Sequence, residues 1–146
     1  MELATASMTI SFARKLEQDS ARFYEGLSER YPQGKDVFLA FAKENGKFVQ
    51  QLQRAYYSVI SDALEGCFAF SMESDAYEFE TGLEEGASHA VALDRAKEIE
   101  GKIEKFYLDA AKQSECLMAD VPRAMLIIAR KRGTRKMQLE SLLGQG

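Results

Sequence analysis

Two glutamates, Glu17 and Glu100, each belong to the same short phrase of sequence. Residues 13–24 read Ala-x-x-Leu-Glu and then Arg-Phe-Tyr, and residues 96–107 read Ala-x-x-Ile-Glu and then Lys-Phe-Tyr, 83 positions later. Each glutamate lies within an apolar stripe at helical spacing. A carboxylate that faces inward is costly unless it is paired, hydrogen-bonded or bound to a metal ion. Two of them in one repeated phrase indicate a shared central site, with metal binding by carboxylates as its candidate chemistry.

A second repeat supports a duplicated hairpin. At an offset of 87 residues the following pairs correspond: Ala42 with Ala129, Glu44 with Lys131, Gly46 with Gly133, and Leu52 with Leu139. The difference of four residues between the two offsets is expected in a connecting loop. Two helical hairpins with carboxylates on their inner faces are the plan of a four-helix bundle that holds metal ions.

Apolar periodicity predicts four helices, at about residues 5–31, 36–63, 88–112 and 120–143. Pro32 ends the first helix, because the residue before proline is disfavoured in the α region. Ser88 is the expected N-cap of the third, and Asp120 followed by Pro122 is a typical start for the fourth. The prediction is therefore an all-α chain that forms one domain over residues 1–146.

Short links predict that helices one and two are antiparallel, and likewise helices three and four. About 24 residues separate helices two and three. A loop of that length without structure is uncommon in a compact domain, so a short helix is expected around residues 74–84. One long crossover between two antiparallel hairpins is the ferritin-like connectivity.

With these residues in view, the chain resembles the rubrerythrin branch of the ferritin-like superfamily over nearly its whole length. In that family the first helix of each hairpin supplies a glutamate six residues before a Phe-Tyr pair, as at Glu17 and Glu100. The second helix of each hairpin supplies Glu-x-x-His. Here Glu44 matches that glutamate in the first hairpin, and Lys47 stands where the histidine is expected.

The second hairpin departs further from the family, with Lys131 at the glutamate position and Thr134 at the histidine position. Of the six ligands that the resemblance implies, Glu17, Glu44 and Glu100 remain. The resemblance therefore implies a degenerate di-iron site that has lost both histidines and one carboxylate. A protonated lysine has no lone pair to give a metal, but its charge can offset clustered carboxylates.

Two functions follow from this ligand set. In the first, the chain is a non-catalytic rubrerythrin-like protein that acts by binding or assembly, with no cofactor. In the second, the residual carboxylates still bind iron or another divalent metal and support a weak oxidoreductase or iron-handling activity, of the metal-dependent rubrerythrin type. Glu17 and Glu100 are expected to be buried, each within reach of Lys47, Lys131 or an interior tyrosine. Tyr24 and Tyr107 are expected to line the interior.

Charge is distributed unevenly along the chain. Residues 63–87 contain seven acidic residues and no lysine or arginine, whereas residues 121–139 contain six basic residues and no acidic one. These opposed blocks suggest a homodimer weakened by salt. The net charge of −4 gives no drive toward nucleic acid or an anionic membrane, and neither is expected as a partner.

Other features carry little chemistry. No apolar run is long enough to span a membrane, and residues 1–6 lack the layout of a signal peptide, so a cytoplasmic location is expected. Cys67 and Cys116 stand alone, outside any Cys-x-x-Cys motif, and are expected to be buried free thiols. His89, the one histidine, is expected to be structural or exposed rather than catalytic.

Overall fold

The computed structural model describes residues 1–59, 71–114 and 120–145. Within these ranges the chain is all-α, with four long helices: α1 (Ala6–Arg30), α2 (Lys35–Val59), α4 (His89–Ser114) and α5 (Asp120–Gln145). The four predicted helices are thereby confirmed to within a few residues at the described ends. The predicted stretch 60–63 and both cysteines, Cys67 and Cys116, lie outside the described residues.

The first hairpin is delimited by local signals. The Thr5 side chain accepts a hydrogen bond from the backbone N–H of Met8 at 3.2 Å and caps α1. The helix ends at Arg30, two residues before Pro32, as proline requires. Gly34 then turns the chain with a φ of +83°, a conformation that side chains disfavour, and α2 begins at the next residue.

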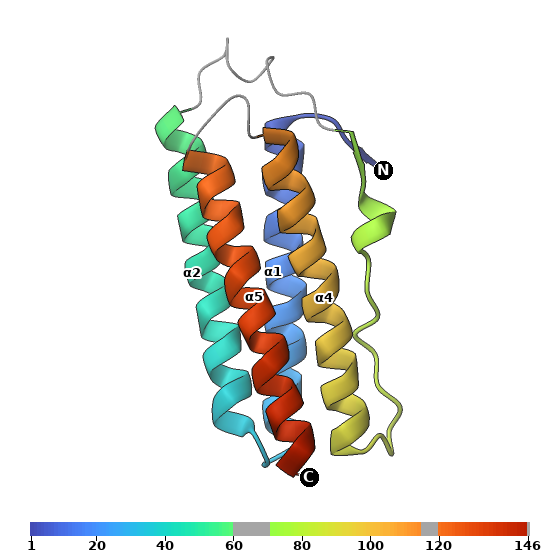
Figure 1. Ribbon diagram of the computed structural model, residues 1–146. Coiled ribbons are helices and arrows are strands. Elements are labelled where there is room, and N and C mark those ends of the chain that lie inside the picture. Colours follow the sequence, from blue (N-terminus) through green and yellow to red (C-terminus); the bar gives the residue numbers. More distant parts are fainter. Residues whose placement is uncertain (60–70, 115–119, 146) are drawn as a thin grey trace.

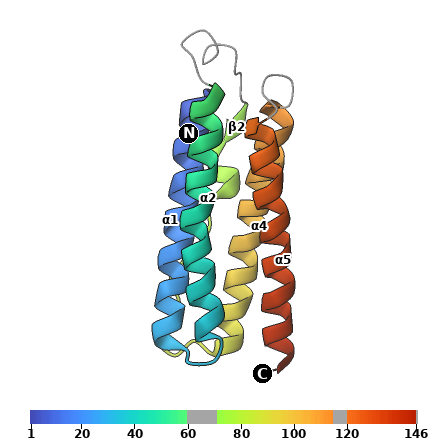
Figure 2. The ribbon, with the colours of Figure 1, turned by 90° about the vertical axis from the view of Figure 1, so that its left-hand side faces the viewer.

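The second hairpin begins at the predicted cap. The Ser88 hydroxyl accepts from the backbone N–H of Val91 at 3.2 Å, and α4 starts at His89. The helix α5 opens with Asp120 in its first turn, and Pro122 follows where a missing N–H costs nothing. Figure 2 shows the two hairpins side by side, α1 with α2 and α4 with α5.

The two helices of each hairpin run in opposite directions, whereas α2 and α4 run in the same direction. In Figure 1, α1 and α5 run downward whereas α2 and α4 run upward, so the chain must return along the bundle between α2 and α4. The described part of this return, residues 71–88, descends beside α4. It is anchored by Tyr77 on Asp109 at 2.7 Å near the upper end, and by Arg95 on the carbonyls of Glu80 and Gly82 lower down.

The descending segment is less helical than predicted. A single 3₁₀ turn, η1 (Ser74–Tyr77), replaces the helix expected over residues 74–84, and residues 78–84 form neither helix nor strand. Just before it, β2 (Met72–Glu73) pairs antiparallel with β1 (Glu2–Leu3), which ties the N-terminus to this segment. Contacts with α4 and with Arg30, which donates to the Glu84 and Glu85 carbonyls, satisfy the segment without further helix.

The core is a continuous apolar interior made by all four helices. Its members include Leu16, Phe38, Ile99, Phe106 and Leu139, each 2% exposed or less. No helix in the described part of the chain is both long and apolar enough to cross a membrane. Buried charged side chains interrupt this interior midway along the bundle, where the two predicted glutamates lie.

Substitution by alanine at two glycines should have opposite effects on the stability of the fold. At Gly46, exposed within α2, a Cβ meets nothing within 4 Å, so Gly46→Ala should stabilise the fold by about 0.5–1 kcal/mol through helix propensity. At Gly34 the positive φ makes Gly34→Ala destabilising by about 1–2 kcal/mol. Urea unfolding of the two variants measures both effects. An equal loss in both would mean that α2 does not continue through Gly46.

Candidate functional site

Glu17 and Glu100 lie at the centre of the bundle, on α1 and α4, and both are 0% exposed. Their hydrogen-bond partners are crossed between the hairpins. The Tyr24 hydroxyl donates to Glu100 Oε1 at 2.6 Å, and the Tyr107 hydroxyl donates to Glu17 Oε1 at 2.7 Å. Each repeated phrase therefore supplies the tyrosine that serves the glutamate of the other phrase. The expectation that both carboxylates are buried within reach of an interior tyrosine is confirmed.

The cation between the two carboxylates is Arg132 of α5, itself 0% exposed. Its Nη1 donates to both oxygens of Glu100, at 2.8 and 2.9 Å, and its Nη2 donates to Glu17 Oε2. Nη2 also approaches the side-chain oxygens of Asn45 at 3.3 Å and Ser20 at 3.4 Å. One guanidinium thus bridges both glutamates and contacts α1, α2 and α4.

A second arginine, Arg135, lies one turn further along α5 and is 1% exposed. Its Nη1 donates to Glu100 Oε1 at 3.2 Å, and its Nη2 donates to the Phe41 carbonyl at 3.0 Å. The same Nη2 reaches Glu44 Oε1 at 2.9 Å. Because the Glu44 side chain is 37% exposed, Arg135 connects the buried charges to the surface of the bundle.

Aromatic rings enclose the two guanidinium groups. The Cζ atom of Arg135 lies 4.6 Å from the centre of the Phe41 ring, 5.1 Å from that of Phe48 and 5.9 Å from that of Tyr24. Arg132 lies 5.5 Å from the Phe48 ring centre. Cation–π attraction is strongest when water is excluded, as it is here, so the rings help to hold both arginines inside the bundle.

These side chains form an alternating series of charges, Glu17, Arg132, Glu100, Arg135 and Glu44, which we call the central charge network. All four carboxylate oxygens of Glu17 and Glu100 accept at least one hydrogen bond. The four buried charges sum to zero. Buried ion pairs are tolerated when geometry is good and the remaining hydrogen-bonding groups are satisfied, and this arrangement meets most of that requirement.

Burial and ion pairing shift the pKa values of the buried ionisable groups in opposite directions. Burial raises the pKa of Glu17, although Arg132 and the Tyr107 hydroxyl favour its charged form. Burial alone would lower the pKa of Arg132, but Glu100 and Glu17 outweigh it, and the pKa rises above its usual value. The guanidinium is therefore the fixed charge of the network.

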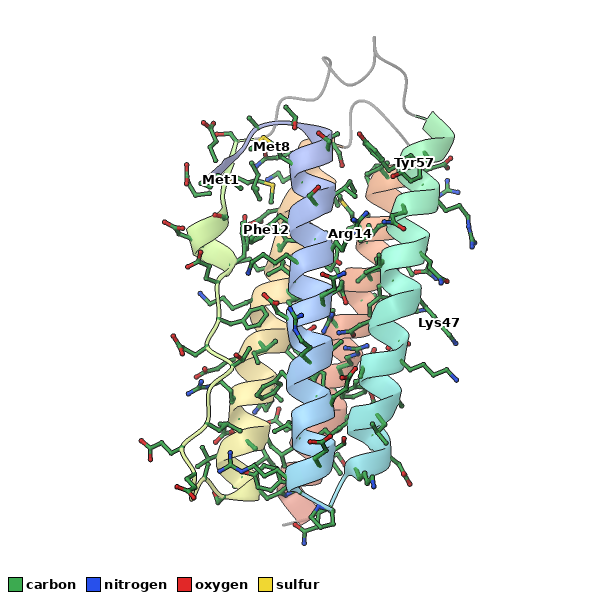
Figure 3. The ribbon with its side chains drawn as sticks, turned by 180° about the vertical axis from the view of Figure 1, so that it is seen from behind. Met1, Met8, Phe12, Arg14, Lys47 and Tyr57 are labelled. Carbon is green, nitrogen blue, oxygen red and sulfur yellow. The ribbon has the colours of Figure 1, made fainter. Side chains whose placement is uncertain are left out.

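The three predicted replacement residues lie outside this network. Lys47, Lys131 and Thr134 are exposed, and Figure 3 shows Lys47 projecting away from the bundle. The expectation that Lys47 and Lys131 offset the central carboxylates is wrong: Arg132 and Arg135 do so. The error is one residue of register on each of the two helices.

The positions that face the centre are Asn45 and Phe48 on α2, and Arg132 and Arg135 on α5. Each pair is spaced i and i+3, and the two pairs are again 87 residues apart. The buried apolar residues of α2 would have located Asn45, which falls between Phe41 and Phe48 on the same stripe. Sequence reasoning followed the chemical match at Glu44 instead.

Of the three carboxylates expected to bind metal, Glu17 and Glu100 are close together and Glu44 is separated from them by Arg135. Within the described ranges no group of three or more histidine, cysteine, aspartate or glutamate side chains is arranged to hold a metal ion. Metal binding at Glu17, Glu44 and Glu100 stays a prediction. His89 lies away from this centre, with Nε2 2.9 Å from the Gln33 carbonyl oxygen.

Buried tyrosines provide a test of this geometry in solution. Burial, with a nearby carboxylate, raises the pKa of Tyr24, Tyr107 and Tyr77. Tyrosines with a higher pKa in the folded state add stability that is intact below about pH 10 and is lost as the pH rises further. Tyrosinate absorbance should therefore show three of the six tyrosines ionising only as the protein unfolds in alkali.

The matched variant for this titration is Tyr107→Phe, which should remove one late-ionising group. Ionisation of all six tyrosines near pH 10 with the fold intact would contradict the crossed hydrogen bonds.

No protein-family model, curated protein or solved structure matches this chain. The resemblance to rubrerythrins stays an expectation that rests on the repeated glutamate phrases.

Proposed function

We propose that this chain is a ferritin-like bundle of the rubrerythrin type in which a network of arginines and glutamates takes the place of the di-iron centre. In this proposal the protein is not an enzyme and acts by binding or assembly. The observation that carries it is the position of Arg132, whose guanidinium donates to both central carboxylates. The return segment along the bundle between two antiparallel hairpins supports the ferritin-like assignment.

The donor chemistry of the centre does not fit a di-iron group. A guanidinium has five N–H donors and no lone pair to offer, so neither Arg132 nor Arg135 can ligate a metal. A divalent cation between Glu17 and Glu100 would also lie against the two guanidinium charges, which repel it. The two positive charges supplied by arginine do the electrostatic work that iron does among clustered carboxylates.

The second function, weak iron binding with oxidoreductase or iron-handling activity, requires a rearrangement. Arg132 and Arg135 would have to leave their aromatic surroundings and free the oxygens of Glu17 and Glu100. Glu17, Glu44 and Glu100 would then supply only oxygen ligands, and such sites with few ligands bind divalent ions loosely. Saturable binding of ferrous iron would support this second function.

Anaerobic titration with ferrous iron, followed by ultraviolet absorbance and by thermal unfolding, distinguishes the two functions. We expect no saturable absorbance change and no rise in the melting temperature, because a ligand stabilises a fold only by binding it. The matched control is Glu17→Gln with Glu100→Gln and Arg132→Met, which removes the central carboxylate charges together with the guanidinium that they pair with. Saturable iron binding by the parent that the control abolishes would overturn the proposal in favour of the residual metal site.

A further inference from the structure

An apolar groove lies between α4 and α5 on the outside of the bundle, where Figure 1 shows these two helices side by side. It has a volume of about 480 Å³, and Leu108, Leu126 and Ile127 line it with 47%, 48% and 40% of their surfaces exposed. Three aliphatic side chains exposed together on two neighbouring helices form a patch. Such a patch marks an interaction site more often than scattered apolar residues do.

Three basic side chains, Lys112, Arg123 and Arg130, line the same groove. None of the three forms an ion pair within the described residues. Together with the three aliphatic residues they define what we call the basic groove. Unpaired cations beside an apolar surface favour a partner of the opposite charge.

Acidic side chains on the same two helices do not neutralise the basic groove. Glu104 pairs with Lys136 at 2.5 Å, and Asp109 accepts a hydrogen bond from the Tyr77 hydroxyl at 2.7 Å. Asp120 lines a separate pocket with residues of α2. The described residues that line the basic groove include no aspartate or glutamate.

The internal repeat allows a comparison with the same place on the first hairpin. Five lining positions have counterparts there, all exposed: Leu108 with Glu25, Lys112 with Glu29, Arg123 with Asp36, Leu126 with Leu39, and Arg130 with Lys43. Three basic residues on the second hairpin thus stand against three acidic residues and one basic residue on the first. A helical hairpin of this bundle forms with either set, so the fold does not require the basic groove.

We propose that the basic groove binds an acidic amphipathic helix of a partner protein. The apolar side chains of that helix would pack against the three exposed aliphatic residues, and its carboxylates would lie beside the three basic ones. This inference rests on the binding role proposed above and names the chemistry of the partner.

The walls of the groove favour a helix over an extended peptide. Both walls are α-helices, whose backbone groups are hydrogen-bonded internally, so the groove offers no strand edge for an extended segment to pair with. An extended segment would leave its own N–H and C=O groups unpaired over an apolar surface, whereas a helix satisfies them itself. The lining from Pro122 to Arg130 spans about 12 Å at the helical rise of about 1.5 Å per residue, enough for about two turns of a partner helix.

The overall charge of the chain favours a protein helix over an anionic membrane. The net charge is −4, so a broad anionic surface is repelled by most of the molecule. A single acidic helix contacts the basic groove alone and is attracted by it. A membrane is therefore an alternative that the experiment below must distinguish.

A designed peptide tests the proposal on the whole chain. The probe is a stapled helix of about 16 residues with leucine on one face, glutamate beside it and alanine elsewhere. The control peptide carries lysine in place of each glutamate. We expect the glutamate peptide to bind with a Kd on the order of 100 µM, as suits a small interface, and to bind less tightly in about 0.5 M salt. Amide NMR shifts should change mainly at residues 108–112 and 123–130.

A charge reversal in the groove gives the decisive result. Lys112→Glu with Arg123→Asp introduces the residues of the first hairpin at two exposed positions. It should weaken binding of the glutamate peptide by about tenfold or more and strengthen binding of the lysine peptide, because the charges across the interface are then exchanged. Lys43→Glu with Lys47→Glu makes the same change in net charge on exposed residues of α2 and should leave both affinities nearly unchanged.

Several results would overturn the proposal. Equal binding of the two peptides by the parent would show that charge does not select the partner, and shifts outside the groove, or no binding at millimolar peptide, would place no helix there. Vesicles of phosphatidylcholine with about one quarter phosphatidylglycerol that bind the parent but not the reversed variant would identify a membrane as the occupant instead. None of these readouts involves iron, so this proposal and the proposed function fail separately.

Discussion

Replacing Arg132 with methionine should destabilise the fold by about 3–5 kcal/mol, because removal of one partner leaves a buried charge uncompensated. Methionine has a similar length and little polarity, so the substitution removes the charge while largely filling the space. Glu17 loses its nearest cation, and Glu100 keeps only Arg135 at 3.2 Å. Urea unfolding at neutral pH measures the loss.

The matched control removes the carboxylate charges as well. Glu17→Gln and Glu100→Gln added to Arg132→Met should recover most of the lost stability, since replacing a whole buried ionic group is often neutral or better. Without Arg132 the pKa of Glu17 rises further, so the deficit of the single variant should shrink as the pH falls toward the ordinary carboxyl range. Equal losses in the single and triple variants at all pH values would mean that Arg132 acts by packing rather than by charge.

The corrected register predicts how a metal centre could be built. Asn45→Glu, Phe48→His, Arg132→Glu and Arg135→His together would place two Glu-x-x-His pairs on the faces of α2 and α5 that point at Glu17 and Glu100. This variant should bind about two ferrous ions per chain. Its metal-free form should be much less stable than the parent, because four clustered carboxylates repel one another, and iron should recover that loss.

A second set of substitutions separates register from composition. Lys47→His, Lys131→Glu and Thr134→His supply two histidines and a carboxylate at the same i, i+3 spacing but on exposed positions. This set should bind no more iron than the parent and should scarcely change stability. Comparable iron loading in both sets would contradict the inward placement of Arg132 and Arg135.

The two central glutamates could be predicted from the sequence because the phrase that contains them occurs twice. Glu17 and Glu100 share a phrase that includes a tyrosine two turns later, and an internal repeat predicts equivalent places in two hairpins. The crossing of the hydrogen bonds, from Tyr24 to Glu100 and from Tyr107 to Glu17, depends on how the hairpins face each other. The spacing of residues within one helix does not show which residues of another hairpin they will face.

The arginines were missed for a physical reason. Arginine is rarely buried unless it is paired, so a cluster of basic residues on α5 reads as a solvated surface. Their burial is evident only from the stripe that runs Met125, Ile128, Arg132, Arg135 and Leu139, whose spacing of three and four residues places all five on one face. The carboxylates that make the burial tolerable lie on other helices, outside any local window of sequence.

We expect guanidinium groups, and not metal ions, to lie between Glu17 and Glu100. A crystal structure of protein produced and crystallised with excess ferrous iron, with anomalous data collected at the iron absorption edge, tests this directly. We predict continuous density for Arg132 between the two carboxylates and no anomalous peak there. An iron peak within about 2.2 Å of oxygens of Glu17 or Glu100, with Arg132 displaced toward solvent, would contradict it.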